Sequence, residues 1–91
     1  MEKLLQLRNN IDKIDNDILC LLKERFEIVK KVKNVKSENK IPILDSKREE
    51  KIFKNIYDNY QEYYVYFKPI YEIIMKESKI YQKGKLKSSS V

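Results

Sequence analysis

One long apolar stripe limits what this chain can fold into more than any other feature. From Leu7 to Val35 the apolar residues recur at alternating spacings of four and three, with one gap at Arg25. This is the repeat of a helix that packs along a single seam. The stripe comprises Leu7, Ile11, Ile14, Ile18, Leu21, Ile28, Val32 and Val35. We therefore expect one helix over about residues 3–37.

Such a helix is too long for a single small globule. Its length would be roughly 50 Å, whereas a compact chain of 91 residues has a radius of gyration of only about 12 Å. An overhanging helix with an exposed apolar stripe is unstable in water. A second copy of the chain, packed along the stripe by two-fold symmetry, is the simplest remedy. The stripe thus predicts a homodimer.

Helix breakers and capping patterns divide the next part of the chain. Pro42 ends any helix before it, and residues 38–44 are expected to form a loop. Ser46 and Glu49 then match a capping box, which marks the start of a helix. A second helix is expected to begin near Asp45 or Ser46 and to span about residues 46–60.

The last third of the chain predicts a third helix and a tail. The apolar spacing favours a helix over residues 64–82, with Pro69 in or near its first turn, where proline is best tolerated. Residues 83–91, with Gly84 and three serines, are expected to be a flexible tail. The predicted fold class is therefore all-α, with one long and two shorter helices in a single domain over residues 1–82.

Composition excludes several classes of site. The chain has one cysteine, Cys20, and no histidine, so it can form neither an intramolecular disulfide nor the usual Cys/His zinc site. Cys20 lies in a Leu-rich helical stretch and is expected to be a small buried apolar side chain. We expect no metal and no cofactor. The lack of a signal-length or membrane-length apolar run, together with the single cysteine, predicts a cytoplasmic protein without membrane association.

The net charge of +6 suits a nucleic acid, an acidic surface or a small anionic ligand. A basic coiled-coil module that binds nucleic acid is one alternative, because a cluster of tyrosines could stack on bases. An aromatic cover over the connection between two helices is the favoured interpretation of that cluster. The tyrosines are Tyr57, Tyr60, Tyr63, Tyr64 and Tyr66.

The gap in the apolar stripe favours the small anion. Arg25 places a guanidinium in an apolar stripe that is expected to be buried. A buried charge needs a partner of opposite sign. Lys36 follows eleven residues later, only about 20° from the azimuth of Arg25 on a helix, with Val32 between them. These three residues predict a positively charged, partly apolar trough for a carboxylate-bearing molecule.

Arg8 cannot reach the same ligand in its own subunit. It lies seventeen residues before Arg25, about 25 Å away along the helix and near 100° around it. In an antiparallel dimer the first part of one long helix can lie over the middle of the other. Arg8 would then enter the partner's trough.

The two shorter helices each offer a face that could close the trough. One face combines a cation, a carboxylate and an apolar side chain, and the other combines two hydrogen-bonding side chains with a methionine. The residues are Arg48, Glu49 and Ile52 on the second helix and Met75, Ser78 and Gln82 on the third. Together the three helices could surround a small anion with donors, one carboxylate and apolar walls.

From Leu7 to Gln82 the chain resembles the all-α type of chorismate mutase. The resemblance is carried, in order, by LRNNIDKIDNDILCLLKERFEIVKKVKNVK, ILDSKREEKI and IIMKESKIYQ. It implies a monofunctional isomerase of Phe and Tyr biosynthesis that rearranges chorismate to prephenate without a cofactor. It also implies an intertwined homodimer in which Arg8 crosses to the other subunit. An isochorismate-pyruvate lyase of the same fold is a second alternative.

The resemblance assigns roles to particular residues. It implies that Arg25, Lys36, Glu49 and Gln82 are catalytic. The residues that it implies for substrate binding are Arg8, Arg25, Val32, Lys36, Asp45, Arg48, Glu49, Ile52, Met75, Ser78 and Gln82. Lys79 departs from the pattern, because an aliphatic residue is expected there.

Overall fold

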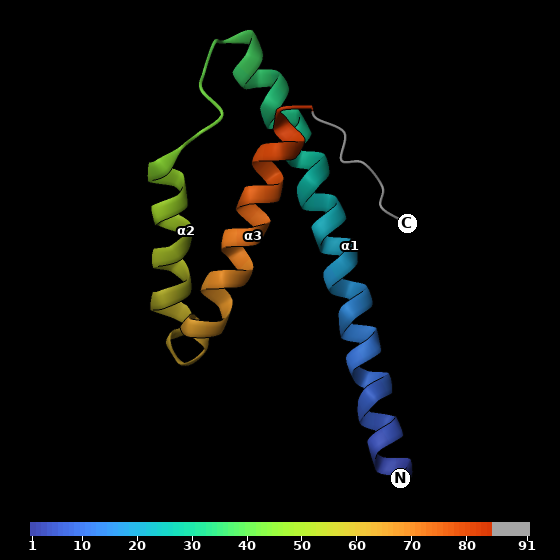
Figure 1. The fold of residues 1–91 in the computed structure, drawn as a ribbon. Helices are drawn as coiled ribbons and strands as arrows, with labels where there is room; N and C mark the ends of the chain where they lie inside the picture. Colours follow the sequence, from blue (N-terminus) through green and yellow to red (C-terminus); the bar gives the residue numbers. More distant parts are fainter. Residues whose placement is uncertain (85–91) are drawn as a thin grey trace.

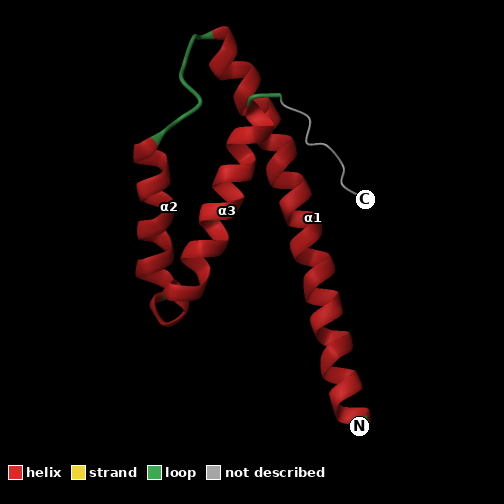
Figure 2. Ribbon diagram, in the orientation of Figure 1, coloured by secondary structure: helices red, strands yellow, loops and turns green. Residues whose placement is uncertain are grey.

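The computed structural model describes residues 1–84, which form helices joined by short loops (Figure 1). The helices are α1 (Glu2–Glu38), α2 (Ser46–Asn59), the short 3-10 helix η1 (Gln61–Tyr63) and α3 (Tyr64–Gln82). Residues 1–84 contain no strand (Figure 2). The predicted all-α class, with one long and two shorter helices, is confirmed. Most of the tail predicted at 83–91 lies outside the described residues.

Helix α3 is the centre of the arrangement. It packs against α1 on one side and α2 on the other, whereas α1 and α2 do not pack against each other within residues 1–84. Figure 1 shows the N-terminal part of α1, in blue, extending well beyond the other two helices. The molecule measures 56 Å along its longest axis and has a radius of gyration of 16.6 Å, against about 12 Å for a compact chain of this length. The overhang expected from the stripe is therefore present.

The apolar stripe of α1 is open to solvent in the single chain. No residue of α1 is buried, and Ile14 and Leu21 keep 57% and 62% of their surface exposed. Cys20 is exposed as well, so the expectation of a buried cysteine is wrong for the single chain. It lies about 200° around the helix from Ile18, which lines a groove against α3, so Cys20 is on the face turned away from α3. None of the helices in residues 1–84 combines the length and apolar character needed to cross a membrane.

A backbone motif ends α1 and turns the chain toward α2. Lys40 adopts a left-handed conformation with φ of 56°. The amide of Ile41 donates to the carbonyl of Lys36 at 2.8 Å, and that of Lys40 donates to the carbonyl of Ser37 at 3.3 Å. These two bonds form a Schellman motif, which satisfies the last carbonyls of the helix. Pro42 follows and prevents the helix from continuing.

Helix α2 is capped by Asp45, one residue before the predicted capping box. Oδ1 of Asp45 accepts from the amide of Arg48 at 3.0 Å, which satisfies one of the free donors of the first turn. The prediction that Ser46 and Glu49 form the cap is wrong, because Asp45 takes the cap position. The side chain of Glu49 is left to point elsewhere.

Aromatic rings pack around the connection between α2 and α3. The rings of Tyr57 and Tyr64 meet edge to face at 5.3 Å between centroids, and Tyr63 stacks on Phe67 at 5.4 Å. Tyr60 also contacts Phe67, at 5.8 Å. Such pairs stabilise the turn that makes α2 and α3 antiparallel neighbours.

Pro69 lies just past the first turn of α3. The helix begins at Tyr64, as predicted, so Pro69 is its sixth residue. The missing amide removes one helical hydrogen bond, to the carbonyl of Val65. Val65 is exposed, so solvent can bond to this carbonyl instead.

Candidate active site

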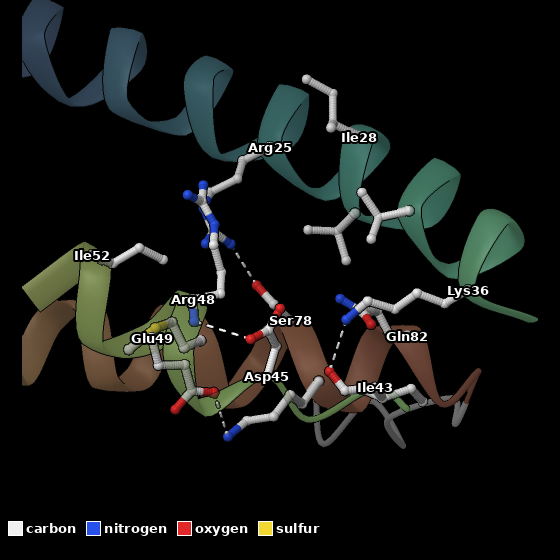
Figure 3. Close-up of a pocket in the computed structure, with 14 residues that line it drawn as sticks. Arg25, Ile28, Lys36, Ile43, Asp45, Arg48, Glu49, Ile52, Ser78 and Gln82 are labelled. Carbon is white, nitrogen blue, oxygen red and sulfur yellow. Dashed lines mark hydrogen bonds and ion pairs between the residues drawn. The ribbon is translucent and has the colours of Figure 1, made fainter. Parts of the chain in front are cut away.

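A pocket of about 240 Å³ opens between the three helices near the C-terminal end of α1. Figure 3 shows its side chains converging from all three helices and from the loop before α2. The residues that line it are Arg25, Ile28, Val29, Val32, Lys36, Ile43, Asp45, Arg48, Glu49, Ile52, Met75, Ser78, Lys79 and Gln82. The α1 members recur every three or four residues, so they share one face of the helix.

A hydrogen-bond chain fixes Arg25 at the pocket wall. Nη1 of Arg25 donates to Oγ of Ser78 at 2.7 Å, and that hydroxyl donates to the carbonyl of Ile74 at 2.7 Å. Ser78 is only 5% exposed. Because the serine is buried and held by its own helix, it anchors one edge of the guanidinium and leaves the other donors of Arg25 free for an anion.

Lys36 reaches across the pocket mouth to the loop before α2. Its Nζ donates to the carbonyl of Ile43 at 3.0 Å. The Schellman motif makes this possible, since it folds residues 41–43 back over the last turn of α1. An ammonium has three donors, so two remain for a ligand.

Gln82 has an unsatisfied polar atom at the pocket. The side chain is 9% exposed, and its Oε1 is buried without a hydrogen-bond partner in the described part of the chain. Leaving such a group unpaired costs about 1–3 kcal/mol. The two ends of an amide exchange by a half turn, so this position can present a donor or an acceptor to a bound molecule.

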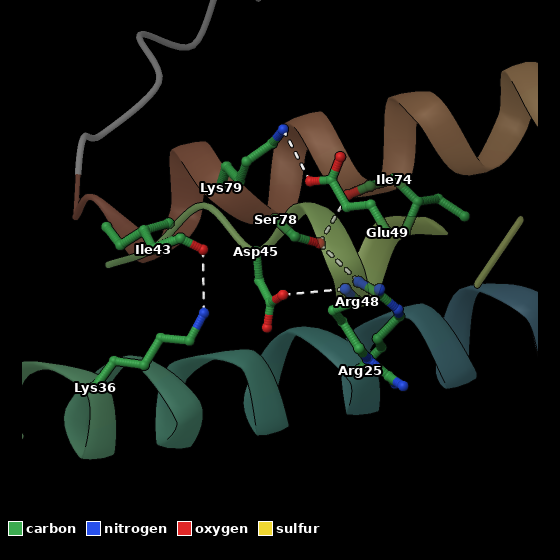
Figure 4. A network of polar contacts seen from close by, with 9 residues as sticks. All are labelled: Arg25, Lys36, Ile43, Asp45, Arg48, Glu49, Ile74, Ser78 and Lys79. Atoms are coloured by element: carbon green, nitrogen blue, oxygen red, sulfur yellow. Dashed lines mark hydrogen bonds and ion pairs between the residues drawn. The ribbon is translucent and has the colours of Figure 1, made fainter. Parts of the chain in front are cut away.

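Helix α2 brings a carboxylate to the opposite wall. Oε2 of Glu49 lies 3.1 Å from Nζ of Lys79 on α3 (Figure 4). Asp45 is occupied as the helix cap, which directs the first turn of α2 toward the pocket. The carboxylate at this wall is therefore held by a lysine on the neighbouring helix.

The pocket carries a surplus of positive charge. Four cations and two carboxylates line it, which leaves a formal excess of two positive charges. Figures 3 and 4 both draw Arg25 and Arg48 side by side. Two guanidinium groups repel each other unless an anion lies between them. Away from the pocket, the pKa of Lys54 is raised because its ammonium donates to Asp58.

Comparison with known proteins identifies a family for this chain. The model of the type II chorismate mutase family matches residues 7–83. The chain belongs to the type II chorismate mutase family. This confirms the resemblance found in the sequence.

The relatives of this chain differ in length. A chorismate mutase from Methanocaldococcus jannaschii is 36% identical over 98% of this chain and 93% of that protein. A bifunctional chorismate mutase/prephenate dehydratase from Aquifex aeolicus is 45% identical over 62% of this chain, but the match spans only 16% of that protein. A solved structure, a conserved hypothetical protein from Pyrococcus furiosus, is 39% identical with a TM-score of 0.76 and covers 90% of this chain and 97% of that one.

Ten of the eleven predicted site residues line the pocket. Arg8 is not among them, and it lies in the exposed first part of α1. Residues 1–84 contain no group of three or more His, Cys, Asp or Glu residues that could hold a metal ion.

Three lining residues were not predicted, namely Ile28, Val29 and Ile43, whereas the resemblance had placed position 79 beside the pocket. Val29 is one turn from Arg25, so helical spacing could have found it. Ile43 contributes a backbone carbonyl, which no sequence pattern marks.

A second, apolar groove lies beside the first pocket. It has a volume of about 320 Å³ and runs between α1 and α3. The groove is lined by Ile18, Leu21, Leu22, Arg25, Phe67, Ile70, Tyr71 and Ile74. Ile18 and Leu21 also belong to the apolar stripe, so the groove continues the stripe toward Arg25.

Proposed function

We propose that this pocket catalyses the rearrangement of chorismate to prephenate. The reaction breaks one C–O bond and forms one C–C bond within the same molecule, so it requires no external nucleophile. The enzyme has to hold a flexible dicarboxylate in its reactive diaxial shape and stabilise negative charge on the ether oxygen. The observation that carries the proposal is the surplus of two positive charges in a pocket with apolar walls, which suits a dianion.

Two arginines bind the carboxylates in this proposal. Arg25 is supported by its bond to the buried Ser78, which fixes the guanidinium before substrate arrives. Ser78 also assists at that carboxylate. Arg8 of the other subunit binds the second carboxylate, since it is too far along α1 to reach the pocket of its own chain. Arginine suits this role because its planar fork binds a carboxylate with two hydrogen bonds.

Lys36 and Gln82 donate to the ether oxygen. The supporting observations are the remaining donors of Lys36 and the buried Oε1 of Gln82, which has no partner in the described residues. A half turn of this amide places the donor Nε2 at the same position. As the C–O bond breaks, negative charge grows on this oxygen, and donors already in place stabilise it without reorganising. Because Gln82 is an amide, it donates at any working pH.

The α2 side of the pocket recognises the ring hydroxyl. Glu49 accepts a hydrogen bond from this hydroxyl, with the backbone at Asp45 nearby, and Arg48 orients this edge of the substrate. The walls against the ring are Val32, Ile52 and Met75. These side chains exclude water and so strengthen the polar contacts.

We propose further that the working form is an intertwined homodimer in the cytoplasm. An apolar stripe with about half of its surface exposed supports a partner chain along α1, since contiguous patches of this kind mark interfaces. The apolar groove beside Arg25 extends the same surface. The chain's one cysteine suits a reducing compartment.

The test is the loss of chorismate absorbance when purified protein is added, with isochorismate assayed in parallel. We expect turnover of chorismate to prephenate and no release of pyruvate from isochorismate. Pyruvate release without chorismate turnover would make the lyase of the same fold the correct function. Binding to DNA or RNA that weakens steeply with salt would favour the nucleic-acid module instead.

A further inference from the structure

Lys79 is a cation at the pocket wall that the proposed reaction does not use. Its Nζ lies 3.1 Å from Oε2 of Glu49, and both residues line the pocket. The two side chains keep 34% and 28% of their surface exposed, so the ion pair is partly withdrawn from water. It also joins α3 to α2 at the rim. The ion pair therefore connects the pocket wall formed by α2 to the wall formed by α3.

The ion pair leaves one carboxylate oxygen available. Lys79 occupies Oε2 of Glu49, so Oε1 remains to accept a hydrogen bond from a ligand. A glutamate side chain has three rotatable bonds, and ordering it only when a ligand binds costs conformational entropy. An ammonium already in contact holds the side chain in one orientation and reduces that cost.

The direction of Lys79 excludes a role as a further carboxylate clamp. Figure 4 shows the ammonium meeting Glu49 on the side away from Arg25 and Arg48. The two guanidinium groups face the centre of the pocket, whereas Lys79 contacts the side of the Glu49 carboxylate that is turned away from them. Its effect on a ligand is therefore exerted through Glu49.

We propose that Lys79 is a positioning residue that holds Glu49 ready for the ring hydroxyl and thereby sets substrate affinity. The inference rests on the proposed function. The bond from the hydroxyl to Glu49 is present both in the bound substrate and in the transition state. Loss of such a uniform interaction raises KM and leaves kcat nearly unchanged.

The test compares Lys79→Met, which keeps length and removes the charge, with Lys79→Arg, which keeps the charge. Lys76→Met is the matched control, because Lys76 is an exposed residue of α3 outside the pocket. We expect Lys79→Met to raise KM for chorismate about tenfold with kcat within about twofold. Lys79→Arg should restore most of the affinity, and Lys76→Met should keep the KM of the wild type.

Repeating the substitution in a Glu49→Gln variant separates the positioning of Glu49 from a general effect on the structure. When Glu49→Gln is already present, Lys79→Met should change KM by less than about twofold, because the group that it positions is gone. The same fold-change in both backgrounds would overturn the inference and show that Lys79 acts on the substrate directly. Equal KM values for Lys79→Met and Lys76→Met would also overturn it. A wild type without chorismate turnover would instead overturn the proposed function itself.

Discussion

The two ends of α1 show opposite relations between polarity and burial. Near its C-terminal end the helix borders a pocket in which the polar Ser78 and Gln82 are only 5% and 9% exposed. Along its first half, the apolar Ile14 and Leu21 are more than half exposed. Folding normally buries apolar groups and leaves polar ones in water. Each departure therefore identifies a surface that is completed by something outside the single chain.

The two surfaces need different partners. At the pocket end, two arginines and two lysines against two carboxylates leave a surplus of positive charge that calls for a small anion. Along the first half, an uninterrupted apolar stripe calls for another apolar surface of similar length. Arg8 lies within this stripe region. In the proposed dimer, the partner chain that covers the stripe would therefore also bring its Arg8 to the pocket.

The largest effect is expected at the pocket end. Lys36→Ala should lower kcat by about 10²–10³-fold, because it removes a donor that faces developing charge. Lys30→Ala is the control, since Lys30 is exposed on the same helix outside the pocket. Steady-state kinetics and circular dichroism on both variants give the measurement. Near-normal turnover by Lys36→Ala would contradict the role given to this lysine.

The next effect tests whether the two ends meet across a dimer. Arg8→Ala and Arg25→Ala should each lose about a hundredfold or more in kcat/KM. After subunit exchange, an equal mixture should recover about a quarter of wild-type activity, since half of the dimers would hold one intact pocket. Exchange is followed with differently tagged chains. Verified exchange without recovery would contradict the crossed Arg8.

The stripe itself is tested by a charge placed in its middle. Ile14→Asp should raise the dimer dissociation constant about thirtyfold or more, because two-fold symmetry buries the charge twice. Asn16→Asp adds the same charge about 200° around the helix and should leave association unchanged. Sedimentation velocity over a dilution series measures both variants. Equal association by the two variants would place the interface elsewhere.

The pH dependence of turnover tests whether the donor at position 82 is an amide, which does not titrate, or a group that does. Wild type should keep its turnover from pH 5 to pH 7.5, because an amide does not titrate. Gln82→Glu introduces a carboxyl that donates only when protonated, so its turnover should fall about tenfold per pH unit above the pKa of that group. Initial rates across this range give the answer. A steep loss in the wild type would show that another group controls the donor.

The smallest effect concerns the turn that ends α1. Lys40 has a positive φ, which costs a non-glycine residue about 1 kcal/mol. Lys40→Gly should therefore raise the free energy of unfolding by about 0.5–1 kcal/mol and leave turnover unchanged. Urea denaturation measures the change. A lower stability would indicate that the lysine side chain contributes more than its backbone conformation costs.

Helical periodicity accounts for what could be predicted from the sequence. The spacing of Arg25, Val32 and Lys36 depends only on helix geometry, and these residues do share the pocket wall. The family pattern then named polar residues on α2 and α3 that the structure gathers at the same pocket. Arg8 stays a prediction, because its proposed contact lies in another chain.

What could not be predicted depends on tertiary placement. Asp45 replaced Ser46 as the cap because one residue of loop length decides which side chain reaches the free amides. The bond from Lys36 to Ile43 depends on the path of the loop after Lys40. Cys20 is exposed because it lies on the face of α1 turned away from the groove that Ile18 and Leu21 form with α3. The pairing of Lys79 with Glu49 required the two helices to be placed side by side.

The central place of α3 also determines when the chain can fold during synthesis. Helices α1 and α2 pack against α3 and not against each other within residues 1–84, and α3 follows both in the sequence. The first 63 residues therefore emerge from the ribosome before their shared packing partner does. Translation adds about 5–20 residues per second, so the nascent chain exposes its apolar stripe for seconds. The packing of α1 and α2 onto α3 can therefore form only after α3 itself has been made.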